Sequence, residues 1–298
     1  MGDASRPHRL VFLGTPEAAV PPLRALVGAG FEVPLVVSRA DRRRGRGGGL
    51  VPSPVKRAAL DLGLVVTERV DDVLADGVDA DLGVVVAFGR LIRPHVLDRL
   101  PMVNVHFSLL PRWRGAAPVE RAILAGDTET GVCVMQLEEG LDTGPIHALE
   151  RTAIGPDETD EELRGRLVTI GTRLLVDTLQ TGLGETVPQV GEPTYADKID
   201  PAELQIDWAR PAVEVHRLVR LGRAWTTFRG RRLRILRTSL DAGPTAGAAP
   251  AGTLDGAFAA TGDGWIGLVT VQPEGRGAQP VQAWRNGARP SPGERLGT

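Results

Sequence analysis

The chain of 298 residues contains a single cysteine and no long apolar run. Cys133 alone cannot form an internal disulfide or complete a multi-cysteine metal site, which excludes a disulfide scaffold and a zinc finger. The longest apolar run, residues 82–89, is far shorter than the roughly 18 residues that a membrane helix needs. The first residues also lack the apolar centre of a signal peptide, so we expect a cytoplasmic protein without a membrane span.

Net charge is small as well, at −2, but it is distributed unevenly. Residues 206–298 contain 13 Arg against 7 acidic residues, a balance of +6, which leaves −8 for residues 1–205. Within that acidic part, residues 39–49 hold five Arg and one Asp. Two basic regions on an acidic body favour a polyanionic partner, the alternative being a solvated loop and a basic tail.

The first half of the chain alternates apolar runs with helical patterns. Residues 10–14, 33–38 and 82–89 are continuously apolar, as strands covered on both faces are. Helices are predicted over residues 17–27 and after Ser53, because Ser53 is a good cap and a proline follows it. This alternation predicts a doubly wound α/β sheet with ligands at the carboxyl ends of its strands.

A long helix is predicted to close this first domain, because Thr159 and Glu162 form a capping box before an apolar repeat of helical period. We expect a folded domain over residues 1–187, a linker over 188–205 that contains three prolines, and a second domain over 206–298. That second domain has one helical stretch followed by short β-rich runs, which indicates a small β-barrel or sandwich.

Asn104 and His106 are the first candidates for chemistry. They are two residues apart, so on an extended strand both side chains leave the same face. An amide donor beside an imidazole suits acyl transfer, because the amide stabilises an oxyanion while the imidazole moves a proton. Asp142, in a glycine-flanked loop, would orient His106 or hold a water beside it. The alternatives are a core histidine and an ordinary turn aspartate.

The pattern N-x-H-x-S-L-L-P-x-x-R-G-A-A-P from Asn104, with a downstream L-D-T-G, resembles the 10-formyltetrahydrofolate-dependent formyltransferases. The segments FLGTPEAAVPPL, VVVAFGRLI, YADKI and VTVQPEGR extend the resemblance along most of the chain. Together they are similar to the branch of this family that acts on methionyl initiator tRNA. The resemblance implies formyl transfer from 10-formyltetrahydrofolate to the α-amino group of that tRNA, for translation initiation.

The resemblance also implies a fold and a set of site residues. The fold is a Rossmann-like domain followed by an OB-like β-barrel, and no metal is expected. Phe88 stands where the family usually has Tyr, so a hydrophobic contact is expected there without a hydroxyl. The catalytic residues would be Asn104, His106 and Asp142, and the folate site would be lined by Phe88, Gly89, Ser108, Leu109, Leu110 and Pro111.

Contacts to tRNA are expected from the two basic regions, on a protein that we expect to be a monomer. Arginine offers bidentate contacts to phosphates and stacks on unpaired bases. Arg43 and Arg44 replace the Pro-Ala of the family pattern, which adds charge to the loop and removes rigidity. The resemblance points to Arg42, Arg46 and Lys56 in the glycine-rich loop and to Arg217, Arg220 and Arg232 in the carboxyl-terminal arginine cluster.

Two other functions are compatible with parts of this sequence. A formyltransferase for an amino-sugar nucleotide would share the three catalytic residues, but a small diphosphate substrate has no need of two basic regions. A non-catalytic tRNA-binding module would not require the catalytic residues and the folate-lining segment together. His147 and His216 are expected to be structural, because they have no ligand partners at metal spacing. Cys133 lies in the apolar run VCVMQL, which predicts a buried strand, so it is expected to be a packing residue and not a nucleophile.

Overall fold

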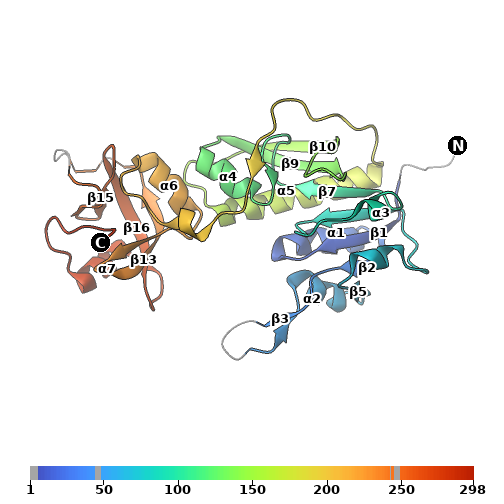
Figure 1. The fold of residues 1–298 in the computed structure, drawn as a ribbon, viewed down its shortest axis with the longest axis horizontal. Helices are drawn as coiled ribbons and strands as arrows, with labels where there is room; N and C mark the ends of the chain where they lie inside the picture. The colour runs from blue at the N-terminus through green and yellow to red at the C-terminus, as the bar shows by residue number, and fades with distance from the viewer. Residues whose placement is uncertain (1–5, 44–47, 242, 245–248) are drawn as a thin grey trace. The chain divides into compact units, whose positions relative to one another are not determined.

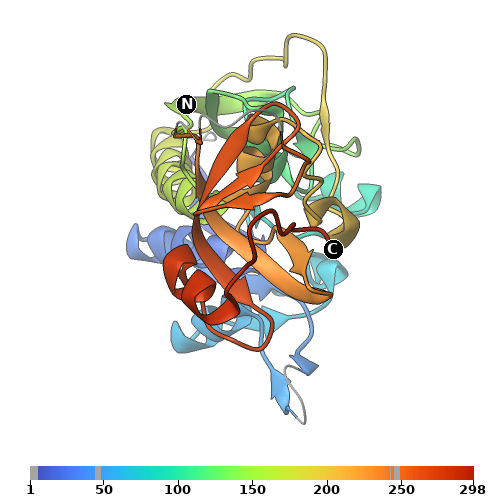
Figure 2. The same cartoon turned by 90° about the vertical axis from the view of Figure 1, so that its left-hand side faces the viewer.

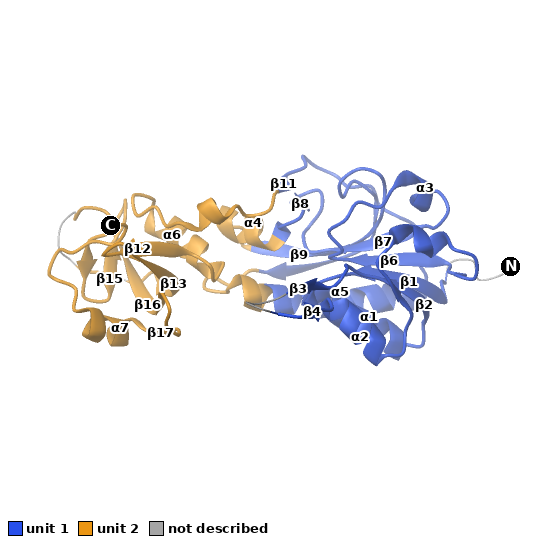
Figure 3. Cartoon of the chain, turned by 60° about the horizontal axis from the view of Figure 1, so that its bottom comes forward, with its two compact units in different colours: residues 1–118, 129–153, 164–196 blue, residues 119–128, 154–163, 197–298 orange. Residues whose placement is uncertain are grey.

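A computed structural model describes residues 6–43, 48–241, 243–244 and 249–298 of the chain (Figure 1). Its contacts divide the chain into two compact units (Figure 3). The first unit comprises residues Met1–Pro118, Glu129–Ala153 and Arg164–Ala196. The second comprises residues Val119–Thr128, Ile154–Leu163 and Asp197–Thr298, so it includes two segments from the first half of the chain.

The first unit is built on a seven-stranded sheet in the order β10-β9-β7-β6-β1-β2-β5. The five strands from β7 to β5 are parallel, β9 is antiparallel to β7, and β10 is antiparallel to β9. The chain changes direction across the sheet between β1 and β6, and this is where such sheets bind ligands. The strands are β1 (Arg9–Gly14), β2 (Glu32–Val37), β5 (Val66–Thr67), β6 (Leu82–Val86), β7 (Met102–His106), β9 (Glu129–Gln136) and β10 (Ile146–Ala153).

Helices cover both faces of this sheet, which confirms the Rossmann-like layering expected from the sequence (Figure 3). On one face, Val73 of η2 and Val96 of α3 pack against Val11 and Leu35. On the other, Gly171 of α5 lies directly against Val105. The helices are η1 (Glu17–Ala19), α1 (Val20–Gly28), α2 (Pro54–Asp61), η2 (Val70–Leu74), α3 (Pro94–Leu97) and α5 (Asp160–Thr181).

Two small strand pairs also belong to the first unit. β3 (Arg42–Arg43) and β4 (Leu50–Val51) form an antiparallel hairpin from the basic loop. β8 (Arg114–Gly115) pairs in parallel with β11 (Tyr195–Ala196), about eighty residues later in the chain. β11 lies inside the segment expected to be a linker without regular structure, so that segment is partly ordered by pairing.

The second unit contains an antiparallel sheet, drawn in orange and red in Figure 2. Its strand order is β12-β13-β16-β15-β14, with β17 paired to β16. Phe228 and Trp284 meet edge to face in its core, with ring centroids 5.1 Å apart. The pairings between the described strands follow an open path and do not close into a barrel. The elements are β12 (Trp225–Phe228), β13 (Arg231–Ser239), β14 (Leu254–Asp255), β15 (Phe258–Ala260), β16 (Trp265–Pro273), β17 (Gln279–Pro280), α4 (Pro118–Ala125), η3 (Pro201–Leu204), α6 (Ala212–Arg220) and α7 (Val281–Ala288).

Among the described residues, no helix combines the length and the apolarity that a membrane crossing requires. Cys133 is buried in β9, where its thiol donates a hydrogen bond to the Ser108 carbonyl, and burial raises the pKa of that thiol to about 11. His147 is held between the Leu183 carbonyl and the Gln136 amide. His216 lies between Thr238 and Pro156, and burial lowers its pKa.

Candidate active site

Asn104 and His106 lie at the carboxyl end of β7, between β6 and β9. They are two residues apart on one strand, so their side chains point to the same face of the sheet. His106 is 5% exposed and Asn104 is half-buried. Within the part of the chain that the structure describes, the Asn104 amide forms no hydrogen bond. It therefore has donors to offer to a substrate atom beside His106.

The orientation of the His106 ring is determined by two neighbours. Nε2 lies 2.8 Å from the carbonyl oxygen of Trp113, and a carbonyl only accepts, so Nε2 carries the proton of the neutral ring. Nδ1 lies 3.6 Å from Oδ2 of Asp142. The same Oδ2 accepts a hydrogen bond of 2.7 Å from the Gly115 amide. Nδ1 is thus the free base, and a proton that it gains faces a carboxylate.

Both backbone positions that support this arrangement are unusual. Trp113 has a φ of 63° and Asp142 a φ of 50°, in the left-handed region that side chains larger than glycine rarely adopt. Such conformations persist only where the surrounding structure holds them, and they are common at functional sites. The supporting residues Trp113 and Gly115 were not predicted from the sequence, because neither carries a chemically reactive side chain.

The expected folate residues lie at the carboxyl ends of β6 and β7. Phe88 is 2% exposed and packs with Ile92, whereas Gly89 beside it is exposed, and its carbonyl accepts a hydrogen bond from Arg39. The Ser108 hydroxyl is fully buried and donates to the Arg112 carbonyl, so it is occupied within its own loop. Leu110 and Pro111 are buried and Leu109 is half-buried.

The basic loop contains the paired strands β3 and β4, and residues 44–47, including Arg44 and Arg46, lie outside the described residues. Arg42 is exposed on β3. Lys56 is different, because its ammonium lies 2.7 Å from Asp41 and 3.2 Å from Glu68. The hydrogen bond with Asp41 is the main cause of a raised pKa at Lys56. Lys56 therefore ties the base of the hairpin to the sheet.

The three arginines expected to contact RNA in the second unit have different environments. Arg220 is buried and donates to the carbonyls of Glu158 and Gly155, at 2.8 and 2.9 Å, and burial lowers its pKa. Arg217 is half-buried, with its guanidinium against Gly126. Arg232 is exposed and stacks over the Trp225 ring at 4.3 Å from the centroid.

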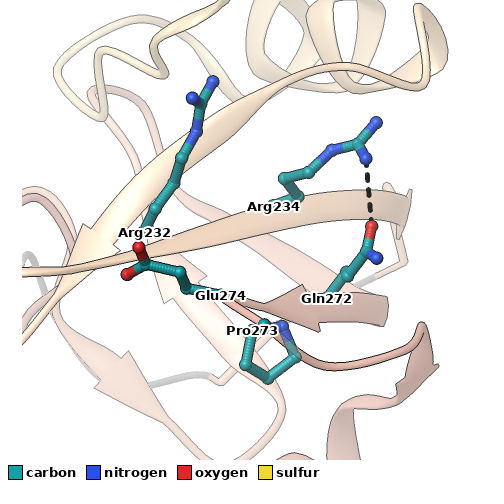
Figure 4. A pocket seen from close by; sticks show the side chains of 6 residues that line it. Arg232, Arg234, Gln272, Pro273 and Glu274 are labelled. Atoms are coloured by element: carbon teal, nitrogen blue, oxygen red, sulfur yellow. Dashed lines mark hydrogen bonds between the residues drawn. The ribbon is translucent and has the colours of Figure 1, made fainter. Parts of the chain in front are cut away.

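A cavity of about 130 Å³ opens beside Arg232 (Figure 4). Arg234 lines it and donates to Gln272 at 3.0 Å and to the Gly222 carbonyl at 2.8 Å. Its walls combine positive guanidinium groups with flat or polar surfaces, and the lining residues are Arg232, Arg234, Gln272, Pro273, Glu274 and Gly275. No group of His, Cys, Asp and Glu side chains that could hold a metal ion occurs among the residues described.

Comparison with known proteins agrees with this geometry. Residues 8–179 match the formyl transferase family model, and residues 198–289 match the formyl transferase C-terminal domain. The methionyl-tRNA formyltransferase of Symbiobacterium thermophilum is 42% identical, over 97% of this chain and 95% of its own length. The methionyl-tRNA formyltransferase of Dinoroseobacter shibae is 47% identical, over 91% of this chain and 94% of its own length.

Two solved structures share the fold at low sequence identity. The sugar 3N-formyl transferase WlaRD, solved in the presence of dTDP and 5-N-formyl-THF, has a TM-score of 0.68 at 18% identity and covers 90% of this chain and 98% of its own. The methionyl-tRNA formyltransferase from Clostridium thermocellum has a TM-score of 0.55 at 16% identity, with coverages of 78% and 93%. With both domain models matched and relatives above 40% identity along nearly the whole length, the chain belongs to the formyl transferase family, among the methionyl-tRNA formyltransferases.

Proposed function

We propose that this chain transfers a formyl group from 10-formyltetrahydrofolate to the α-amino group of methionyl initiator tRNA, with Asn104, His106 and Asp142 at the reaction centre. The enzyme is a formyl-group transferase of translation initiation, and 10-formyltetrahydrofolate is its co-substrate. The observation that carries the residue assignment is the His106 ring, held by the Trp113 carbonyl with its free Nδ1 beside the Asp142 carboxylate.

The chemistry requires an amine to attack a formyl carbon, which forms one carbon–nitrogen bond and places negative charge on the formyl oxygen. The Asn104 amide donates to that oxygen as the charge develops. His106 takes the proton that the amine loses, through Nδ1, and Asp142 stabilises the imidazolium. His106 then returns the proton to the folate nitrogen as the second carbon–nitrogen bond breaks, so the enzyme ends in its starting state.

The folate site is proposed at the carboxyl ends of β1, β6 and β7. A flat pterin needs apolar contact combined with backbone hydrogen bonds. The buried Phe88 and Leu110 side chains supply apolar surface, and the exposed Gly89 leaves backbone accessible. Gly14 at the end of β1 is adjacent, since Thr15 donates a hydrogen bond of 3.4 Å to the Phe88 carbonyl.

For the RNA, exposure favours direct contacts from Arg42 and Arg232. Arg46, which lies outside the described residues, and the half-buried Arg217 are included in the proposal because of the family resemblance. Arg220 and Lys56 are assigned supporting roles, because their charged groups already bind atoms of the chain. The proposal includes a monomeric protein. It also includes a first domain that ends at residue 187 and a linker that ends at residue 205. The OB-like character of the second domain also stays a prediction, given the open strand path.

The competing function is formylation of an amino-sugar nucleotide, which the same three catalytic side chains would perform. The basic hairpin and the arginine-rich second unit favour the larger polyanion. Incubation with labelled 10-formyltetrahydrofolate and separate pools of charged tRNA and amino-sugar nucleotides tests this directly. Label is expected on methionyl-tRNA alone, and label on a sugar nucleotide with none on tRNA would refute the proposal.

A further inference from the structure

Residues 187–196, which follow α5, form hydrogen bonds with two loops of the reaction centre, and we refer to them as the strap. The first loop, residues 107–117, follows His106 and carries Trp113. The second loop, residues 138–145, carries Asp142. The strap begins with a two-way backbone pairing between Val187 and Ile146 and ends in β11, which pairs with β8. All of these segments belong to the first unit.

Gln189 of the strap links the two loops through one side chain. Its Nε2 donates to the carbonyls of Asp142 and Gly144, both at 2.8 Å. Its Oε1 accepts from Nε and a terminal nitrogen of Arg114, at 3.1 and 2.6 Å. Both donor hydrogens of the amide are therefore used on the Asp142 loop, while its oxygen holds the other loop. This arrangement defines the separation between the two loops.

Thr194 of the strap holds the other partner of His106. Its Oγ1 accepts a hydrogen bond of 2.8 Å from the Trp113 amide, and its carbonyl accepts one of 2.8 Å from Arg114. These bonds flank the Trp113 carbonyl that receives the proton of His106 Nε2. Because Trp113 has a left-handed φ that costs free energy, the bonds from Thr194 help to maintain it.

We infer that Gln189 and Thr194 are positioning residues of this enzyme: Gln189 acts through Asp142, and Thr194 acts through Trp113 on His106. The inference rests on the proposed function, because it takes His106 and Asp142 as the residues of the reaction. Displacement of a reacting group by about 1 Å can cost roughly 100-fold in rate, so bonds of this kind matter without any contact to substrate.

The test uses variants of the full-length enzyme in which one strap residue loses its side-chain hydrogen bonds to a loop of the reaction centre. Gln189→Glu keeps an acceptor for Arg114 but places a carboxylate against the carbonyls of Asp142 and Gly144. Thr194→Val removes the hydroxyl at constant shape, and Thr194→Ser keeps it. Gln189→Glu and Thr194→Val are expected to lower kcat by about 10- to 100-fold, with KM for charged tRNA changed by less than about twofold.

The conservative and control variants separate positioning from general damage to the fold. Thr194→Ser is expected to retain most of the wild-type kcat. Val190→Ala, at a strap residue that is 84% exposed, should leave kcat unchanged. Melting temperatures and circular dichroism identify any variant that does not fold. If Gln189→Glu is unstable, Thr194→Val still tests the strap, because it deletes a single oxygen.

Double variants then test the route by which each residue acts. In an Asp142→Ala background, Gln189→Glu should cause little further loss, and Thr194→Val should cause little in a His106→Ala background. Losses that multiply fully in the double variants would overturn the inference, as would wild-type kcat in Gln189→Glu and Thr194→Val. Wild-type kcat in His106→Ala and Asp142→Ala would instead overturn the proposed reaction centre, and the inference with it.

Discussion

The carbonyl oxygen of Trp113 lies 2.8 Å from Nε2 of His106, so a backbone group, and no side chain, selects the tautomer of the candidate catalytic histidine. The consequence is that Nδ1 is available as a base on the side of Asp142. A backbone carbonyl only accepts hydrogen bonds, so it fixes this tautomer of the neutral ring. The chemistry of the ring then depends on Asp142 and on the substrate.

Replacement of His106 by Ala is expected to lower kcat by about 10²- to 10⁴-fold, as is typical of a positioned acid or base. Asn104→Ala is expected to cost roughly 10²- to 10³-fold, the loss caused by removal of one oxyanion donor. Single-turnover formylation of methionyl-tRNA measures both. His95→Ala, at an exposed histidine of α3, is the matched control and should behave as wild type. Near-normal kcat in either test variant, with intact folding, contradicts the assignment.

Asp142→Asn separates the charge of this residue from its structural role. An asparagine oxygen can still accept the hydrogen bond from the Gly115 amide, but the carboxylate opposite Nδ1 is gone. We expect kcat to fall about 10²-fold while KM for both substrates stays close to wild type, because the lost interaction strengthens only as the imidazolium forms. A change confined to KM would show that Asp142 binds substrate and does not stabilise the imidazolium.

Elements with strong local signals could be predicted from the sequence. Ser53 caps α2 by accepting from the Lys56 amide at 3.0 Å, and Thr159 and Glu162 form the expected capping box of α5. In each of these caps, the two residues that bond to each other are three positions apart in the chain. The apolar runs of β1 and β2 were equally clear, since strands covered on two faces contain few polar residues.

The support of the candidate site could not be predicted in this way. β8 and β11 have two residues each and pair over a long stretch of chain, so no periodicity marks them. The left-handed φ of Trp113 has no sequence signal, because only glycine and a few polar residues favour that region. Gln189 looks like an ordinary residue of a proline-rich linker. Its role depends on contacts between distant segments, which only the fold provides.

Arg220→Met is expected to destabilise the protein and to leave tRNA affinity of the folded enzyme unchanged. Its guanidinium is buried and donates to the carbonyls of Gly155 and Glu158, and the variant would lose both of these hydrogen bonds. The loss should be about 3 kcal/mol in the free energy of unfolding, measured by urea denaturation. The control is Arg223→Met, whose side chain is 46% exposed and should cost less than about 1 kcal/mol. Weaker tRNA binding with unchanged stability would return Arg220 to the RNA interface.

The hydrogen bonds of Glu162, in the second unit, predict that the stability of the protein depends on pH. Hydrogen bonds from the amide and hydroxyl of Thr159, and then from Arg237, lower the pKa of this carboxyl to about 2 from 4.5. A lowered pKa means that the stabilisation is complete above the unfolded value and is lost as pH falls towards the folded value. Wild type should therefore exceed Glu162→Gln in stability at pH 7, and the difference should shrink as pH falls from 4.5 towards 2.

Urea midpoints of both proteins between pH 7 and pH 3 provide the measurement. Glu161→Gln changes net charge equally at the adjacent exposed position, outside these hydrogen bonds, and serves as the control. A difference between wild type and Glu162→Gln that stays constant down to pH 3 would mean that the stabilisation does not depend on ionisation of the carboxyl group, which would contradict this prediction.

The basic hairpin predicts how tRNA binding responds to salt. If Arg42 and Arg46 contact phosphates, the Arg42→Ala/Arg46→Ala variant should raise the KM for charged tRNA and leave the KM for folate unchanged. The slope of log K against log salt should decrease by about 0.7 to 0.9 for each lost contact. Arg24→Ala/Arg99→Ala removes the same charge from exposed positions away from the hairpin and should keep the wild-type slope.

A Lys56 variant tests the hairpin prediction independently of the arginine variant. The ammonium of Lys56 is paired with Asp41 and Glu68, so Lys56→Met removes two ion pairs that hold the hairpin. It does not remove a cation that is available to bind phosphate. We expect the KM for charged tRNA to rise while the salt slope stays near that of wild type, in contrast to the arginine variant. Equal decreases in slope for both variants would place Lys56 on the RNA. An unaltered slope in the arginine variant would instead leave the hairpin as a solvated turn and favour the sugar-nucleotide substrate.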